Sequence, residues 1–485
     1  MTMETRMNWK QLLSAETQVP REIEPEEFAK YPMDDLEKDY KAIISSAAFR
    51  RLQDKTQVFP LDKSDFVRTR LTHSLEVSTI ARQLGIMITQ NTTGYLPDEF
   101  KIKGQKNELV EKIPIVLSCA GLLHDLGNPP FGHFGEVVIG EWFQSEFQKK
   151  EFCYKGTPIV KLLSEQMRHD LENFEGNAQA LRILSKIRNK GKSHEINLTT
   201  GVIGALIKYP TNSLNFTDKK DPDIRKHKLG YYYSEQETFE KVSKETGTWL
   251  DEENVARHPL TFLMEAADDI AYSTADLEDA FKKKMFSLKE FITYFKEKMG
   301  DDGKAGLLIK NLEERLRDVN DDESEMVAFQ NWMDYARGWF MYCVAFNFSK
   351  NYQAIMNGEF QQELIHETFH DRSMQIFKDA MKKFVYEESE IVKLELSAKK
   401  IISTLLDDFI YAVIYMDESD EAYKVNKVQE KLCSLIPDNL KADYNNAKTG
   451  EASYDLYLRF LMITDFISGM TDSYAKNLYQ ELNAY

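Results

Sequence analysis

Apolar side chains recur at helical spacing along almost the whole chain. Between residues 71 and 88 they fall three to five positions apart, at Leu71, Leu75, Ile80, Leu84 and Ile88. Residues 181–187 and 260–271 show the same spacing, which places apolar side chains on one face of an α-helix. The alternation of Val, Ile and Thr that indicates strands is scarce. The pattern predicts an all-α fold whose helices each bury one face.

The organisation beyond these helices is simple. Segment 209–230 is rich in Gly, Pro, Asn, Asp and Lys, which predicts a loop, and we expect it to face a substrate. No internal repeat and no low-complexity tract occurs. We expect one large helical domain over residues 1–325 and a carboxy-terminal helical region over residues 326–485.

Composition narrows the class of protein. Of the 485 residues, 42% are hydrophobic and 29% are charged, as in folded globular proteins. The net charge of -17 argues against a surface that coats nucleic acid but leaves room for a local basic pocket. Four scattered cysteines without a C-x-x-C pair indicate thiols in a reducing compartment. With neither a secretory signal nor an apolar run of about 20 residues, we expect a cytoplasmic protein without a membrane span.

Candidate chemistry begins with the dipeptide His-Asp, which occurs at 124, 169 and 370. Only His124-Asp125 follows an apolar helix, over residues 115–123, which the segment 127–130 terminates. Two polar side chains at a buried helix end need partners, and a divalent cation would supply one. Imidazole with carboxylate suits Mn, Fe, Co, Ni or Mg better than a thiolate-seeking zinc site, and His73 is the natural second imidazole. A hydrogen-bonded core histidine is the plainer alternative.

A third polar segment lies inside the apolar helix that begins near residue 260. Asp268, Tyr272 and Asp276 stand at i, i+4 and i+8, so they share one face, whereas Asp269 is rotated by about 100° from Asp268. A carboxylate, a phenol and a second carboxylate in a row, flanked by Ala and Ile, are typical of the wall of a polar pocket. A salt-bridged acidic face is the alternative.

At this point the sequence resembles a family. The order His73, His124-Asp125, Asp268 is similar to that of the HD-domain metal phosphohydrolases, and longer strings resemble the deoxyguanosinetriphosphate triphosphohydrolases. These strings are FRRLQDKTQVFPL (49–61), RTRLTHSLEV (68–77), HDLGNPPFGHFGE (124–136), NFEGNAQ (173–179), IKYP (207–210) and ISGMTD (467–472). The resemblance covers most of residues 36–290 and resumes near the carboxy terminus, while residues 300–385 carry none.

The resemblance implies a metal site and a reaction. One divalent ion, Mn or Mg with Co, Ni or Fe as alternatives, would be held by His73, His124, Asp125 and Asp268. Water would attack the α-phosphorus of dGTP and release deoxyguanosine and inorganic triphosphate. His133 and Glu136 resemble the catalytic pair of the family, with the carboxylate orienting the imidazole. Whether His133 acts on the water or on the leaving 5'-oxygen stays open.

The resemblance also implies substrate contacts. Phosphate oxygens would meet Arg51, Arg70, Lys208 and Lys228, and Tyr209 would also contact the substrate. Gln57 and Asp276 would hold the 3'-hydroxyl, while Tyr272 would fill the space of a 2'-hydroxyl, a direct way to reject ribonucleotides. In the carboxy-terminal region, Glu395 would accept the N1-H and N2-H donors of guanine. Broad-specificity relatives carry a histidine where this chain has Asn128, which favours guanine.

Alternatives of other classes stay open. One is a broad-specificity dNTP triphosphohydrolase, and another is a nucleotide-sensing or single-stranded-DNA-binding helical protein with incidental turnover, although a sensor would not need His133 and Glu136. The resemblance further implies a symmetric homo-oligomer, often a hexamer, with single-stranded DNA as a possible effector. Residues 326–485 would then contribute to the base pocket and to oligomer contacts.

Overall fold

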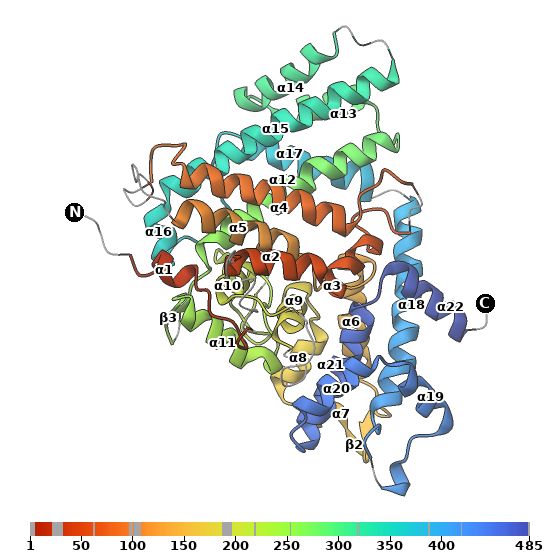
Figure 1. The fold of residues 1–485 in the computed structure, drawn as a ribbon. Coiled ribbons are helices and arrows are strands. Elements are labelled where there is room, and N and C mark those ends of the chain that lie inside the picture. Colours follow the sequence, from red (N-terminus) through yellow and green to blue (C-terminus); the bar gives the residue numbers. More distant parts are fainter. Residues whose placement is uncertain are drawn as a thin grey trace.

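A computed structural model of the chain describes residues 5–21, 33–61, 64–96, 100, 108–186, 196–217, 220–252, 254–317, 319, 321–386, 389–418 and 420–483. Most of these residues lie in helices (Figure 1). The strands they contain form two small antiparallel hairpins, β1 (Cys153–Tyr154) with β2 (Thr157–Pro158) and β3 (Trp249–Asp251) with β4 (Asn254–Val255). The predicted all-α fold is confirmed.

The helices fall into a first group that ends before residue 320 and a second group that begins after it. The first group is α1 (Trp9–Leu12), α2 (Asp35–Ser45), α3 (Ala47–Arg51), α4 (Arg70–Thr89), α5 (Glu108–Leu123), α6 (Gly132–Glu146), α7 (Ile159–Leu162), α8 (Glu165–Glu172), α9 (Gly176–Ser185), α10 (Thr200–Leu206), α11 (Gln236–Glu245), α12 (Pro259–Lys282), α13 (Leu288–Met299) and α14 (Gly303–Arg315). The second group is α15 (Asp322–Lys350), α16 (Tyr352–Met356), α17 (Asp371–Met381), α18 (Ser389–Val413), α19 (Lys427–Leu435), α20 (Asp438–Ala447), α21 (Ala452–Ser468) and α22 (Asp472–Leu482). Short 3-10 turns are η1 (Leu52–Asp54), η3 (Ile224–Lys226), η4 (Tyr233–Glu235) and η6 (Glu421–Tyr423), and η5 (Lys382–Tyr386) is a π-helical turn.

Helices α4, α9 and α12 confirm the three segments with apolar periodicity, although Ile187, at the end of the second segment, lies outside the described residues. All the apolar positions predicted for α12 are buried. In α4 the prediction for Leu75 is wrong, because this side chain is exposed. The buried face of α4 instead carries His73, Val77 and Leu84, and Leu75 lies about 200° away from His73 around the helix.

Two hydrophobic clusters make up the interior. The first joins α2, α4, α5, α10 and α12 with α13 to α17, and α4 packs against both α5 and α12. The second joins α6 and α8 with α18, α20 and α21. Helices α14 and α15, on either side of residue 325, both pack into the first cluster, and the predicted domain division there stays a prediction. All four cysteines are free. None of the described helices has the length and apolarity to cross a bilayer.

The carboxy-terminal helices return to the loops around His124-Asp125. Lys55 donates from its buried amine to the carbonyl oxygens of Asn128 and Ser468, each at 2.6 Å, and burial lowers the pKa of this amine to about 7. Asp472, at the start of α22, accepts a hydrogen bond from the backbone N-H of Phe131 at 2.9 Å. Residues 467–472 therefore hold the segments around Lys55 and Phe131 in position through hydrogen bonds.

Candidate active site

Three segments far apart in the sequence bring the four predicted metal ligands together. His73 comes from α4, His124 and Asp125 from the turn after α5, and Asp268 from α12. Oδ1 of Asp268 lies 3.2 Å from Nε2 of His73 and 3.4 Å from Nε2 of His124. The ligand atoms of His73, His124 and Asp125 all lie within 4.8 Å of one another. The structure thus places two imidazoles and two carboxylates around one point.

The donor set fits a divalent cation. The Nδ1 atom of His124 lies 2.8 Å from the carbonyl oxygen of Gly121, so the proton of a neutral imidazole belongs there and Nε2 keeps its lone pair. That Nε2 atom is buried and has no hydrogen-bond partner among the described residues, yet it faces Asp125 and Asp268 at 3.4 Å each. A cation bound by imidazole nitrogen and carboxylate oxygen would satisfy all these atoms at once.

Two basic side chains donate hydrogen bonds to the two carboxylates of the cluster. Arg70 donates to Oδ2 of Asp125 at 2.6 Å, and Lys208 donates to Oδ2 of Asp268 at 3.0 Å. Burial opposes ionisation of both carboxyls, but the charge of Arg70 holds the pKa of Asp125, and that of Lys208 the pKa of Asp268, well below the usual range. Both carboxylates are therefore ready to bind a cation at neutral pH.

A cavity of about 700 Å³ opens onto this cluster. Its lining includes twelve of the fifteen predicted site residues: Gln57, Arg70, His73, His124, Asp125, His133, Lys208, Tyr209, Lys228, Asp268, Tyr272 and Glu395. The volume lies within the range of about 300–1,000 Å³ of small-molecule sites. The described part of segment 209–230 contains only the short turn η3, and Tyr209, Ile224, His227 and Lys228 line the cavity, which confirms a loop that faces the site.

His133 and Glu136 form a pair on α6. Nδ1 of His133 lies 2.8 Å from Oε2 of Glu136, while the ring is 72% exposed and reaches the cavity. The carboxylate of Glu136 raises the pKa of the imidazole. Glu136 lies behind the lining and accepts a hydrogen bond from the backbone N-H of Gly176 at 3.0 Å. A Cβ at Gly176 would lie 2.7 Å from Oε1 of Glu136, so glycine allows this contact.

Lys228 also lines the cavity. Its amine donates to Glu175 at 3.0 Å, and although burial opposes this, Glu175 raises the pKa of Lys228. Together with Arg70 and Lys208, it brings three basic side chains to the lining of the cavity that contains the four-ligand cluster. This arrangement can bind a polyanion such as a triphosphate.

Two predicted substrate residues lie apart from the cavity lining. Arg51 lies with Lys55 and Lys186 beside a separate cavity of about 410 Å³ between α3, α9, α20 and α21. Asp276 is fully buried, and neither of its carboxylate oxygens has a hydrogen-bond partner among the described residues. Burial, followed by the charge of Asp279, raises the pKa of Asp276. The phosphate contact of Arg51 and the sugar contact of Asp276 stay predictions.

Among the cavity-lining residues that the sequence analysis missed are Tyr386 from η5 and Lys378 from α17. The hydroxyl of Tyr386 lies 2.5 Å from that of Tyr272, and Lys378 donates to Asp269 at 3.0 Å. Burial raises the pKa of Tyr272 to about 12, so its phenol stays protonated. Both missed residues lie at or beside the stretch without resemblance, and only the packing of α17 on α12 brings them to the site.

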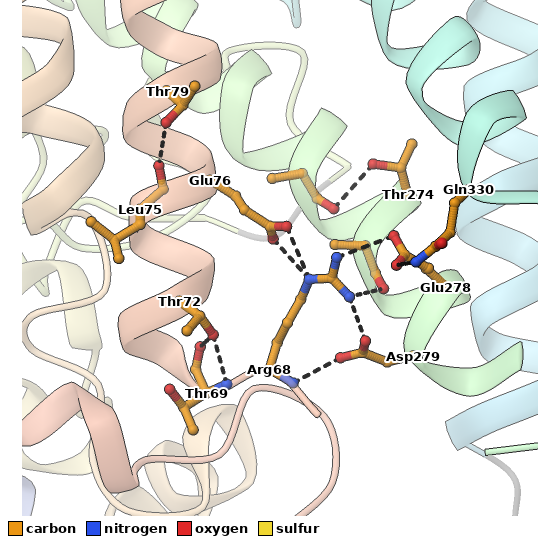
Figure 2. A network of polar contacts seen from close by, with 12 residues as sticks. Arg68, Thr69, Thr72, Leu75, Glu76, Thr79, Thr274, Glu278, Asp279 and Gln330 are labelled. Atoms are coloured by element: carbon orange, nitrogen blue, oxygen red, sulfur yellow. Dashed lines mark hydrogen bonds and ion pairs between the residues drawn. The ribbon is translucent and has the colours of Figure 1, made fainter. Parts of the chain in front are cut away.

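Arg68 holds the start of α4 against α12 (Figure 2). Its guanidinium pairs with Glu76 at 3.0 Å, with Glu278 at 3.1 Å and with Asp279, and its backbone N-H donates to Asp279 at 2.8 Å. Since α4 carries His73 and α12 carries Asp268, this network holds together the two helices that carry these predicted metal ligands.

We expect Arg68→Met to destabilise the protein, because three carboxylates lose their central cation. Breaking a buried network of this kind costs about 3–5 kcal/mol, and urea denaturation measures the loss. Arg317→Met is the matched control, because the ion pair of Arg317 with a described residue is with Glu314, on the surface, at 3.8 Å. Its effect should stay within about 0.5 kcal/mol. Equal stabilities of the two variants would contradict a role for Arg68 in holding α4 on α12.

Comparison with known proteins agrees with the geometry. Residues 70–238 match the HD domain family, and residues 365–481 match the Phosphohydrolase-associated domain. The first match contains His73, His124, Asp125 and the pair on α6, and the second contains the helices that return to the site. The fold and the site therefore define an HD-domain phosphohydrolase.

Relatives along the whole chain specify the family. A deoxyguanosinetriphosphate triphosphohydrolase-like protein of Listeria monocytogenes is 42% identical over 450 residues, which cover 92% of this chain and 93% of the relative. A deoxyguanosinetriphosphate triphosphohydrolase of Yersinia pseudotuberculosis is 32% identical over 493 residues, which cover 93% of this chain and 94% of the relative. The chain belongs to the deoxyguanosinetriphosphate triphosphohydrolase family, as its motifs indicate, and it is a hydrolase.

Proposed function

We propose that this enzyme hydrolyses dGTP to deoxyguanosine and inorganic triphosphate, with water attacking the α-phosphorus. The observation that carries the proposal is the shared cavity, in which the four-ligand cluster, His133 and three basic side chains meet. The names of the relatives support dGTP as substrate. The enzyme is further proposed to be a cytoplasmic homo-oligomer, with single-stranded DNA as an effector to be tested.

The cavity residues have three proposed roles: metal binding, phosphate binding and proton transfer. A divalent ion, Mn or Mg, held by His73, His124, Asp125 and Asp268 would act as a Lewis acid toward the α-phosphate. The cations of Arg70, Lys208 and Lys228 would bind the phosphate oxygens and balance their charge. His133, oriented by Glu136, would transfer a proton at its Nε2 atom.

Sugar recognition is assigned to Gln57, Tyr272 and Asp276. The amide oxygen of Gln57 is buried without a hydrogen-bond partner among the described residues, so it is free to accept the 3'-hydroxyl. The ring of Tyr272 lines the cavity, and Tyr386 fixes its hydroxyl. A ring held in this way can fill the space that a 2'-hydroxyl would need.

We expect Tyr272→Ala to lower the ratio of kcat/KM for dGTP to kcat/KM for GTP. The smaller side chain should lower kcat/KM for dGTP, because a sugar contact is lost, and raise it for GTP, because the 2'-hydroxyl now fits. Each factor of ten in the ratio represents about 1.4 kcal/mol of discrimination. Tyr272→Phe is the control that keeps the ring and should keep most of the ratio. Asp276→Ala should lower kcat/KM for dGTP and for GTP by a similar factor, since both nucleotides carry the 3'-hydroxyl. An unchanged ratio in Tyr272→Ala would make the ring a packing residue.

Guanine preference depends on two positions. Glu395, on α18, lines the cavity, and burial raises the pKa of its carboxyl. The amide of Asn128 donates to Oδ1 of Asp125 at 2.5 Å, so this side chain contacts the four-ligand cluster. The histidine that the resemblance places here in broad-specificity relatives, and whose imidazole could contact the substrate, is replaced in this chain. A broad dNTP triphosphohydrolase is the runner-up, while a nucleotide or single-stranded-DNA sensor would leave the pair His133 and Glu136 without a purpose.

The experiment that tests the function compares substrates and products. Purified protein is assayed against the four dNTPs and GTP with Mn or Mg, and the products are separated by ion-exchange chromatography. The proposal requires deoxyguanosine and triphosphate, with dGTP the best substrate. Similar rates for all dNTPs would establish the broad enzyme, and pyrophosphate or single phosphate as product would overturn attack at the α-phosphorus.

A further inference from the structure

The string 467–472 carries part of the family resemblance, yet none of its residues lines the catalytic cavity. Its last residue, Asp472, begins α22 and is 1% exposed. The two carboxylate oxygens of Asp472 accept hydrogen bonds from two segments that lie 416 and 341 residues away along the chain. Because Asp472 lies behind the lining, it can influence the reaction only through the segments that it holds.

The first of these segments carries Gln57. Oδ2 of Asp472 accepts a hydrogen bond from the backbone N-H of Thr56 at 3.0 Å and a second one from the Thr56 hydroxyl. Thr56 and Gln57 both line the cavity. Thr56 also pairs with Thr69, the N-cap of α4, in an isolated β-bridge. Asp472 therefore holds the backbone directly before the residue to which the 3'-hydroxyl contact is assigned.

The second segment leads to His133. Oδ1 of Asp472 accepts a hydrogen bond from the backbone N-H of Phe131 at 2.9 Å. Phe131 has a left-handed backbone with a φ of 62°, which costs about 1–2 kcal/mol in a residue with a side chain and persists where the surrounding structure holds it. Phe131 is the N-cap of α6, and His133 is the second residue of that helix. Asp472 therefore fixes the point at which the helix of the catalytic pair begins.

The start of α6 leaves little room for a shift. Gly132, which follows Phe131, also has a left-handed backbone, and a Cβ atom there would lie 2.5 Å from Nη2 of Arg70. The first residue of α6 thus lies directly against a guanidinium that lines the cavity. A displacement of about 1 Å between reacting groups can lower a rate by about 10². The hydrogen bonds of Asp472 act on a part of the site where small displacements matter.

We infer that Asp472 is a positioning residue, which keeps His133 in register with Gln57, so that a nucleotide held at its sugar presents its reacting atoms to the imidazole. The inference rests on the proposed function, in which Gln57 binds the 3'-hydroxyl and His133 transfers a proton. Asp472 belongs to the region that matches the Phosphohydrolase-associated domain. That region would thereby set the rate of a reaction whose proton-transfer group lies in the HD domain.

The first test is Asp472→Asn, which keeps the shape of the side chain but replaces one acceptor oxygen with an N-H donor. We expect kcat for dGTP to fall at least about tenfold, with a smaller change in KM and an unchanged metal content, because the four proposed ligands stay.

Asp170→Asn is the matched control. Asp170 is also 1% exposed, accepts a hydrogen bond from the backbone N-H of Tyr233 at 2.7 Å and accepts further ones from Ser213 and Tyr457, but it does not line the cavity. Its melting temperature should fall as that of Asp472→Asn does, whereas its kcat per folded molecule should match the wild type. A merely structural role for Asp472 would make the two variants alike.

A double-mutant cycle tests whether Asp472 acts through His133. Effects on independent steps multiply, whereas effects that pass through one residue do not. In the His133→Ala background, Asp472→Asn should therefore lower kcat by less than about twofold. Thr56→Val removes only the hydroxyl donor to Asp472 and is the second variant should Asp472→Asn not fold. We expect it to lower kcat about threefold, and this loss should also disappear in the His133→Ala background.

Two results overturn the inference: a wild-type kcat per folded molecule in the folded variant of this pair, or a loss of kcat that persists in full in the His133→Ala background. Failure of the proposed function looks different. Wild-type turnover by His133→Ala alone would refute the catalytic role of His133, and the inference would fall with it.

Discussion

Asp125→Ala is expected to abolish both metal retention and hydrolysis of dGTP. The carboxylate of Asp125 faces Nε2 of His124 at 3.4 Å and accepts a hydrogen bond from Arg70 at 2.6 Å, so its loss would remove one proposed ligand and leave the charge of Arg70 beside the proposed cation. We expect kcat/KM to fall by at least about 10³, or about 4 kcal/mol of transition-state stabilisation. Metal analysis of the purified variant and the dGTP assay measure the two effects.

The control comes from another His-Asp dipeptide. Asp371, the first residue of α17, contacts His366 at 3.1 Å and is not among the residues that line the cavity, so Asp371→Ala should keep the metal and most activity. Asp170 in the third dipeptide serves less well, because it is buried and accepts hydrogen bonds from Ser213 and Tyr457 at 2.5 Å each. Equal metal loss in Asp125→Ala and Asp371→Ala would remove the case for the cluster.

His133→Ala is expected to lower turnover by about 10² to 10⁴, the usual effect of losing one acid or base. Metal content and dGTP affinity should persist, because the ring reaches the cavity from α6 and is not one of the four proposed ligands. Metal analysis, dGTP binding and kcat separate these effects. Loss of metal or of dGTP binding would instead make His133 a ligand or a structural residue.

The pH profile of Glu136→Gln shows which proton His133 moves. The Glu136 carboxylate raises the pKa of His133, so its removal lowers that pKa, and the limb of kcat/KM that His133 controls should move to lower pH. If the alkaline limb moves, the imidazolium donates to the leaving 5'-oxygen. If the acidic limb moves, the neutral imidazole accepts from the attacking water. A profile with neither limb displaced would exclude His133 as the proton-transfer group.

Arg51 and Asp276 illustrate where sequence reasoning meets its limit. Asp276 shares a helical face with Asp268 and Tyr272 because helical spacing is a local property, whereas its full burial depends on the helices packed around α12. Arg51 lies in a strongly matching string, but α3 directs it to the neighbouring cavity. Motif and spacing give the residue and its face, whereas the surrounding helices decide what that face meets.

The sequence by itself determined the all-α class, the position of His124-Asp125 at a helix end, and the polar row on α12, because apolar periodicity and the cost of burying unpartnered polar groups can be read over a few turns. Only the tertiary structure decided that α17 and η5 bring Lys378 and Tyr386 to the cavity, that Arg68 ties α4 to α12, and that Asp472 joins the segments of Thr56 and Phe131. Those contacts join segments up to hundreds of residues apart, and no local pattern encodes which faces of two helices pack together.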